Sequence, residues 1–277
     1  MDSKKVTAVN LLQYKELGEK ITALSLYDYP QAKIADENMI DIILIGDSLG
    51  MVFRGEANTL SVSVDDIAYH TAAVKRAVNR ALVVADMPFM SYKISYDEAL
   101  SNGTKLIKAG AEAVKIEGGT QDMVDLAARF TTAGIPVMGH LGLTPQSIHS
   151  LGGFKLQGKD QTKADQILDE ALKLESAGAF SIVLECIPTD LAKDISSRLK
   201  IPTIGIGAGI SCDGQILVAA DMFGLSAGKS PKFVKCYANV SKLMGESISA
   251  YISDVKNSSF PAEIHSYKGK KPKLKVL

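Results

Sequence analysis

Charged and polar side chains stand directly after several wholly apolar runs in this chain. The run Ile-Ile-Leu-Ile before Gly46 has no polar face, which is typical of a strand buried on both sides. A charged group at the end of such a strand is costly to bury unless a partner holds it there. Five apolar runs end in such a residue, which indicates one shared site formed by many strand ends. The five residues are Asp47, Asp86, Glu117, His140 and Glu185.

Strand-like and helix-like segments alternate along most of the chain. Strands are expected at residues 22–28, 41–48, 82–88, 113–117, 136–140, 181–186, 203–207 and 217–220. Helical apolar spacing is clearest at residues 64–79, 96–109, 121–133, 163–176 and 190–199. Eight such alternations favour parallel strands joined by right-handed crossovers. We therefore predict a single-domain α/β fold, a (β/α)8 TIM barrel, over residues 1–257 with an N-terminal helical extension, followed by a basic C-terminal tail at 258–277.

A weak internal repeat supports the alternation. Residues 108–117 (KAGAEAVKIE) parallel residues 176–185 (SAGAFSIVLE). Each copy has a glycine suited to a left-handed helix end, then a short apolar strand, then a glutamate.

Composition excludes several classes of function. The chain has 277 residues, 46% of them hydrophobic, with a formal net charge of zero, so it carries no overall positive field for nucleic acid. No run approaches the roughly 18 apolar residues that span a bilayer, and the first residues do not resemble a signal peptide. The cysteines Cys186, Cys212 and Cys236 lack the spacing of a disulfide framework or zinc site. We expect a soluble cytoplasmic protein.

The carboxylates at the strand ends are candidate ligands of a cation. Asp47 and Asp86 follow neighbouring strands, and oxygen-only ligands suit Mg²⁺, which takes one or two carboxylates and keeps several waters. Glu117 is placed to bind the same ion directly or through a water. The alternative for Asp47 is a turn or helix N-cap, a common role for aspartate before Ser-Leu-Gly.

Three further residues suit proton transfer or anion binding, and each has a structural alternative. Lys115 lies within an apolar strand on the same side as Glu117, which fits a carboxylate clamp, a Schiff base or a structural ion pair. Glu185 has apolar neighbours, a setting that raises the pKa of a carboxyl group and suits it to proton transfer. The alternative for Glu185 is a structural role, as a helix cap or in a salt bridge. His140 is a candidate for contact with a substrate carbonyl, or it is a packed histidine.

Two loops fall at the expected mouth of the barrel. The polar segment 143–161 follows the fifth strand, in the position of a loop that covers a site. The glycines of segment 205–209 follow the seventh strand, where they either bind phosphate or permit close backbone approach. The Lys-rich end of the chain reads as a solvated terminus, with contact to an anion or a partner as the alternative.

Taken together, these stretches resemble the ketopantoate hydroxymethyltransferase family of pantothenate synthesis, from about Gly18 to Tyr237. The matching segments are residues 45–52, 69–71, 83–89, 114–119, 139–147, 178–180, 183–185, 203–209 and 212–215.

The resemblance implies a (β/α)8 barrel, Mg²⁺, 5,10-methylenetetrahydrofolate as one-carbon donor, and a homo-oligomer, many members being decamers. It places the metal ligands on Asp47 and Asp86, with Glu117 close to the metal. The contacts of the 2-oxo acid fall on Asp47, Ser48, Asp86 and Lys115. The catalytic base falls on Glu185 and the histidine of the family motif on His140. The implied reaction converts 3-methyl-2-oxobutanoate to 2-dehydropantoate.

Two other functions use similar residues. A metal-dependent lyase of the phosphoenolpyruvate mutase and isocitrate lyase type places similar acids at similar strand ends, although the His-Leu-Gly-Leu-Thr-Pro block argues against it. A non-catalytic barrel that binds an anion needs no Glu185.

Overall fold

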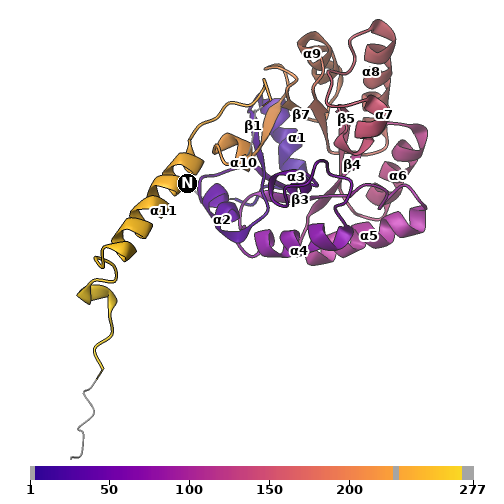
Figure 1. Cartoon of the computed structure of the whole chain (residues 1–277). Coiled ribbons are helices and arrows are strands. Elements are labelled where there is room, and N and C mark those ends of the chain that lie inside the picture. Colours follow the sequence, from indigo (N-terminus) through magenta and orange to yellow (C-terminus); the bar gives the residue numbers. More distant parts are fainter. Residues whose placement is uncertain (1–3, 227–230, 270–277) are drawn as a thin grey trace, which may run out of the picture.

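A computed structural model describes residues 4–226 and 231–269, and it confirms the barrel. Eight strands pair in parallel in chain order, and β8 closes onto β1. Helices lie around this sheet (Figure 1). The strands are β1 (Ile21–Ser25), β2 (Ile42–Ile45), β3 (Leu82–Asp86), β4 (Ala113–Glu117), β5 (Val137–Gly142), β6 (Ser181–Glu185), β7 (Thr203–Ile206) and β8 (Gly214–Val218).

Helices surround the barrel and connect its strands, and the expected ones are found within a few residues of their predicted bounds. In chain order the α-helices are α1 (Ala8–Leu17), α2 (Tyr29–Glu37), α3 (Leu49–Val52), α4 (Val64–Lys75), α5 (Tyr96–Ala109), α6 (Gln121–Thr132), α7 (Ile148–Leu151), α8 (Gln161–Ser176), α9 (Thr189–Arg198), α10 (Ala219–Met222) and α11 (Val240–Lys256). Short 3-10 turns lie at Pro145–Ser147 and Glu263–His265. The predicted N-terminal extension corresponds to α1.

The prediction for the eighth strand was wrong by about half its length. Residues 219–222 form helix α10, and the strand begins earlier, at Gly214. Gly214 permits close packing at the start of the strand, because a Cβ there would lie 2.5 Å from the carbonyl oxygen of Ile21 on β1. The strand therefore starts where its neighbour leaves no room for a side chain.

The barrel interior changes from apolar to charged along each strand. Alternate residues of a strand share a face, so Leu82, Val84 and Asp86 of β3 all point inward. Leu82 and Val84 belong to the apolar cluster that fills the barrel, as does Ala113 of β4, which Lys115 follows on the same face. The apolar layers thus support a charged layer at the carboxyl ends.

The opposite end of the barrel is sealed by the N-terminal segment. The amide of Val6 donates to the carbonyl oxygen of Arg80, and Val6 and Leu11 join the interior cluster. Lys15 of α1 lies 2.9 Å from Asp213, just before β8. This end holds structural contacts, so any opening to the interior lies at the carboxyl ends of the strands.

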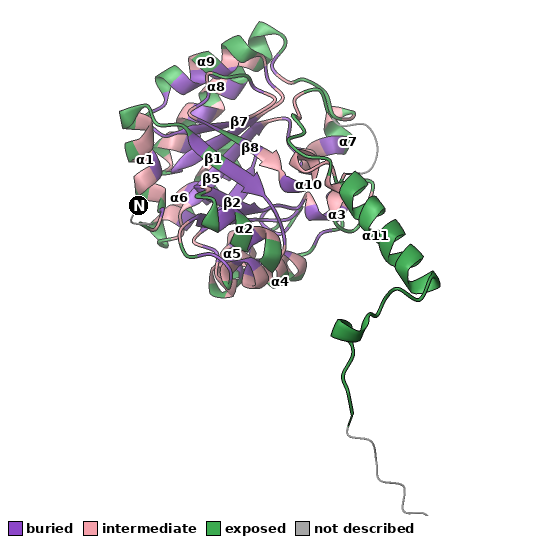
Figure 2. Cartoon of the chain, turned by 90° about the vertical axis from the view of Figure 1, so that its left-hand side faces the viewer, coloured by how far each residue is buried: buried purple, intermediate pink, exposed green. Residues whose placement is uncertain are grey.

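Helix α11 stands clear of the barrel, as both overall views show (Figures 1 and 2). None of its residues is buried, yet it carries an exposed apolar stripe at helical spacing: Met244, Ile248, Tyr251, Ile252 and Val255. Across residues 4–226 and 231–269, no helix combines the length and apolar character that crossing a bilayer requires. The Lys-rich end discussed above lies mostly outside the described residues.

Gly142, the last residue of β5, adopts a conformation that only glycine accepts without strain. Its φ is +92°, and a Cβ there would collide with the carbonyl oxygen of Glu185 and approach Ile187 Cγ2 to 2.6 Å. We expect Gly142→Ala to lower the free energy of unfolding by about 2–4 kcal/mol in urea titrations, from backbone strain plus overpacking. The matched control is Gly134→Ala, with φ +82° but open space around it, which should cost only about 1 kcal/mol. Equal losses in the two variants would contradict the collision.

Candidate functional site at the carboxyl ends of the strands

The structure brings the predicted strand-end residues into one continuous chain of polar contacts. The amide of Asp47 donates to Asp86 Oδ2 at 3.2 Å, and Lys115 Nζ donates to Asp86 Oδ1 at 2.5 Å. Lys115 Nζ also lies 3.7 Å from Glu117 Oε1. The chain continues through His140, whose Nδ1 lies 3.2 Å from Glu117 Oε1 and whose Nε2 lies 3.2 Å from Oε2 of Glu185.

Strand register explains why these side chains meet. Asp86 of β3 is the direct partner of Lys115 on β4, and Glu117 on β4 is the direct partner of His140 on β5. All four point into the barrel, and neighbouring residues on one face of a sheet lie within contact distance. The parallel closed sheet therefore converts separate strand ends into a single ring of charge.

Negative charge accumulates on the β2 and β3 side of this ring. Burial, together with the charges of Asp86 and Glu117, raises the pKa of Asp47 well above its usual value. Burial also raises the pKa of Asp86, against the opposing effect of the Lys115 ammonium group. Despite the cost of burial, the pKa of Lys115 is raised, because it faces these carboxylates. One lysine among three buried carboxylates leaves room for further positive charge.

His140 carries a proton at neutral pH. Burial and the Lys115 charge oppose protonation, but contacts with the carboxylates of Glu117 and Glu185 outweigh them and raise the pKa of His140 to about 9. The same contact to His140 lowers the pKa of Glu117 although burial opposes this. His140 thus donates a hydrogen bond from Nδ1 to Glu117, while its buried Nε2 lies 3.2 Å from Glu185 Oε2 without the geometry of a hydrogen bond.

Ser48 lies beside the ring in a group of hydroxyls. Its Oγ lies 2.7 Å from the hydroxyl of Tyr27 and 3.4 Å from Oγ of Ser25 on β1. The backbone carbonyl oxygen of Tyr27 in turn accepts a hydrogen bond from the ring nitrogen Nδ1 of His70, 2.7 Å away. Ser48 begins helix α3 without capping it, and the Asp47 side chain forms no cap either, so the structure does not support the N-cap alternative for Asp47.

Two buried residues of the site escaped the sequence analysis, namely Gln146 and Tyr92. The side-chain amide of Gln146 donates to Asp47 Oδ2 at 3.0 Å, and its backbone amide donates to Glu117 Oε2 at 3.0 Å. The Tyr92 hydroxyl donates to Gln146 Oε1 at 2.7 Å. Gln146 comes from the loop after β5, so the segment 143–161 contributes a side chain to the site. Gln146 lies within the matching segment 139–147, but a glutamine within Thr-Pro-Gln-Ser resembles an ordinary polar loop residue, so the segment was matched without a role for this side chain.

The glycine loop after β7 serves close packing. Gly207 and Gly209 have φ of +64° and +85°, and a Cβ at either would meet Phe233 or Thr189 within 3 Å. This supports the reading of close backbone approach.

Cys186, directly after Glu185, is not a suitable nucleophile. Burial raises the pKa of its thiol to about 11, so the thiol stays protonated at neutral pH.

The donor set fits a hard divalent cation. The carboxylates of Asp47 and Asp86 supply oxygen ligands, and the raised pKa values of both reflect a site that favours added positive charge. Among residues 4–226 and 231–269, no three or more His, Cys, Asp or Glu side chains form a ready-made metal cage. Both oxygens of Glu117 already contact His140 or Gln146, and both oxygens of Asp86 already accept from Lys115 or the amide of Asp47, so a bound cation would share these carboxylates with their present partners.

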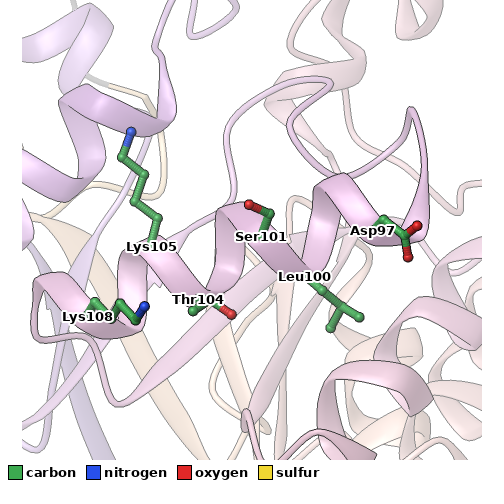
Figure 3. A pocket seen from close by; sticks show the side chains of 6 residues that line it. All are labelled: Asp97, Leu100, Ser101, Thr104, Lys105 and Lys108. Atoms are coloured by element: carbon green, nitrogen blue, oxygen red, sulfur yellow. The ribbon is translucent and has the colours of Figure 1, made fainter.

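A hollow elsewhere on the surface lies apart from these residues. It measures about 580 Å³ along the exposed side of helix α5, opposite the buried Ala99 and Gly103 (Figure 3). Its lining is Asp97, Leu100, Ser101, Thr104, Lys105 and Lys108. None of the strand-end residues belongs to it, so the candidate site remains the ring of charge.

Comparison with known sequences identifies one family over nearly the whole chain. Residues 5–263 match the sequence profile of ketopantoate hydroxymethyltransferase. Relatives named 3-methyl-2-oxobutanoate hydroxymethyltransferase include one from Thermoanaerobacter sp. (strain X514), 53% identical over 265 residues, covering 95% of this chain and 96% of the relative. Another, from Clostridium botulinum (strain Alaska E43 / Type E3), is 52% identical over 274 residues, or 99% of both chains.

Solved structures share the fold at low sequence identity. Phosphonopyruvate hydrolase, in a complex with oxalate and Mg²⁺, superimposes with a TM-score of 0.60 at 12% identity, covering 94% of this chain and 93% of the other. A 2,3-dimethylmalate lyase of the phosphoenolpyruvate mutase and isocitrate lyase superfamily gives 0.56 at 15% identity, covering 96% and 92%. At this identity the likeness establishes the barrel alone.

Proposed function

Because the chain belongs to the ketopantoate hydroxymethyltransferase family, we propose that it transfers a hydroxymethyl group from 5,10-methylenetetrahydrofolate to 3-methyl-2-oxobutanoate, giving 2-dehydropantoate. The observation that carries the proposal is the buried ring in which Lys115, His140 and the carboxylates meet at the mouth of the barrel. A cytoplasmic location is part of the same proposal.

The cation in this proposal is Mg²⁺, held by Asp47 and Asp86, with Glu117 acting through water. When bound, such an ion supplies Lewis-acid stabilisation of the negative charge that develops on the keto oxygen of the substrate.

The remaining residues bind the substrate and move its proton. Lys115, cationic and buried, neutralises the substrate carboxylate, and Ser48 donates a hydrogen bond beside it. Glu185 removes the proton from C3. Water adds to the methylene carbon of the folate, both carbon–nitrogen bonds of that carbon break, and tetrahydrofolate leaves with the two protons of the water, so that the one-carbon unit is released as formaldehyde. The electron pair left on C3 then forms a bond to the carbon of formaldehyde, whose oxygen takes up the proton from Glu185 and becomes the hydroxyl group. The protonated His140, with Nε2 3.2 Å from Glu185 Oε2, orients that carboxylate before the transfer.

The direct test is the transfer reaction itself. The purified protein is incubated with 3-methyl-2-oxobutanoate and ¹³C-labelled methylenetetrahydrofolate, with and without Mg²⁺, and the product is followed by NMR. We expect labelled 2-dehydropantoate only in the complete mixture. Carbon–carbon cleavage of 2-methylmalate-type acids without folate would instead favour the lyase, which shares the barrel fold and similar strand-end acids. Ligand binding with no turnover of any of these substrates would favour a non-catalytic barrel.

We also propose that the protein forms a homo-oligomer, a decamer in line with the family resemblance. The support within this chain is the exposed apolar stripe of α11. In addition, the helix that directly follows β8, α10, has only four residues, and the longer α11 has no buried residue. We propose a second copy of the chain as the partner that covers this stripe, because contiguous exposed apolar patches mark interaction sites and most soluble oligomers are built from identical chains.

Disrupting the stripe should reduce the assembly. We expect Ile248→Asp to shift the mass measured by light scattering towards smaller species, because a buried unpaired charge is costly at an interface. The control is Ala250→Asp, the same charge on the opposite side of α11. An unchanged mass for Ile248→Asp, or an equal shift in both variants, would refute the role of the stripe.

A further inference from the structure

Gln146 connects the carboxyl ends of four strands through a single side chain and its own amide. Its Nε2 group donates both to Asp47 Oδ2 at 3.0 Å and to the carbonyl oxygen of Met87 at 2.9 Å. Its backbone amide holds Glu117, and its Oε1 accepts from Tyr92. Gln146 itself extends from the end of β5 and is only 3% exposed. Each polar atom of the side chain is therefore used, inside the candidate site.

The contacts of Gln146 fix which way its amide faces. Oε1 must face Tyr92, because the Tyr92 hydroxyl already accepts the backbone amide of Glu117 at 3.1 Å and has its own proton left to donate. Nε2 must then face Asp47 and Met87, both of which offer acceptors there. The network thus holds one donor against one particular oxygen, Oδ2, of the Asp47 carboxylate.

A fixed donor on one oxygen orients the whole carboxylate. With Oδ2 engaged, the rotation of the Asp47 carboxylate is set, and its charge is partly offset, which lowers the raised pKa of Asp47. Partners that hold a ligand in this way change metal affinity by about 10- to 100-fold when they are removed.

We propose that Gln146, oriented by Tyr92, is a positioning residue that presents the Asp47 carboxylate to the divalent cation. This inference rests on the proposed function, because that function supplies the cation. In this proposal the loop after β5 strengthens cation binding through Asp47, and Gln146 itself does not contact the reacting atoms.

Equilibrium binding of Mn²⁺ in the absence of substrate tests the proposal. Free Mn²⁺ is measured by electron paramagnetic resonance for the wild type and for Gln146→Met, which keeps the length of the side chain and removes the amide. We expect the Kd for Mn²⁺ to rise about 10- to 100-fold. In the activity assay the concentration of cation needed for half-maximal rate should rise in parallel, while KM for the 2-oxo acid changes less.

Two further variants keep the result decisive. Gln166→Met makes the same change at an exposed position on α8, where the glutamine contacts only Glu170, and should leave the Kd unchanged. Tyr92→Phe removes only the hydroxyl that orients Gln146, so it replaces Gln146→Met if that variant does not fold, with an expected rise of about 3- to 10-fold, smaller than the loss of the whole partner.

The outcomes separate the inference from the proposed function. If folded Gln146→Met, or Tyr92→Phe in its place, binds Mn²⁺ as tightly as the wild type, the inference is wrong and the cation site stands, with Gln146 a structural residue that affects only thermal stability. If the wild type itself binds no Mn²⁺, the proposed cation site fails, and the inference fails with it.

Discussion

Glu185→Gln should lower kcat by about 10²- to 10⁴-fold, the usual contribution of a positioned general base. The amide has the shape of the carboxylate but cannot accept the C3 proton. Binding of the 2-oxo acid should largely survive, because Lys115 and Asp86 lie on other strands and do not contact Glu185. The sharpest measurement is exchange of the C3 proton of 3-methyl-2-oxobutanoate with D₂O, followed by NMR without folate, because it reports proton removal alone.

The matched control for this variant is Glu16→Gln, the same substitution at an exposed residue of α1 at the sealed end of the barrel. It should exchange the proton at the wild-type rate. Exchange at the wild-type rate in Glu185→Gln as well would remove Glu185 from the role of base. Another group at the mouth of the barrel would then remove the proton, and not His140, which already carries one at neutral pH.

The sequence predicted the barrel because its strongest signals are local. Apolar runs without a polar face, followed by amphipathic segments, determine both the strand order and the direction of the strands. Once the strands are parallel, their carboxyl ends share one mouth, so Asp86, Lys115, Glu117 and His140 had to lie together. The pairings themselves depend on register, which no local pattern specifies.

The parts that escaped prediction depend on contacts between distant segments. Gln146 acquires its role only because its loop folds over the ends of β2, β3 and β4, where its contact Asp47 is 99 residues away in sequence. The start of β8 at Gly214 depends on the close approach of β1. Helix α11 is a different case, because its stripe of Met244, Ile248 and Val255 has visible helical spacing and nonetheless packs on no part of the barrel. Periodicity indicates an apolar face but does not say which surface covers it.

Asp47→Asn should abolish most cation-dependent turnover and at the same time stabilise the metal-free protein. The asparagine keeps an oxygen for the Gln146 amide but removes the charge that the cation needs, so we expect activity to fall by about 10²- to 10³-fold, as for removal of one preorganised electrostatic contact. Asp47→Ala should lose activity too, but it also strips Gln146 of its acceptor and is the poorer test.

The gain in stability follows from the direction of the pKa shift. Burial and the charges of Asp86 and Glu117 raise the pKa of Asp47 in the folded protein above its value of 3.8 in the unfolded chain. The folded state therefore binds the proton more tightly, and stability is lost as pH rises from 3.8 through the raised folded pKa. At neutral pH the wild type has therefore lost all or part of this stability, whereas Asp47→Asn has no carboxyl group to ionise and keeps it.

Thermal unfolding with chelator and with Mg²⁺ separates the two effects of Asp47→Asn. In chelator at neutral pH the variant should melt at a higher temperature than the wild type, and the difference should shrink as the pH falls towards 4. Added Mg²⁺ should raise the melting temperature of the wild type, since a ligand that binds only the folded state stabilises it, and should leave the variant unmoved. A variant that melts at a lower temperature than the wild type in chelator would show that the buried charge of Asp47 does not destabilise the metal-free protein. A variant whose melting temperature rises with Mg²⁺ as much as that of the wild type would show that Asp47 does not bind the cation.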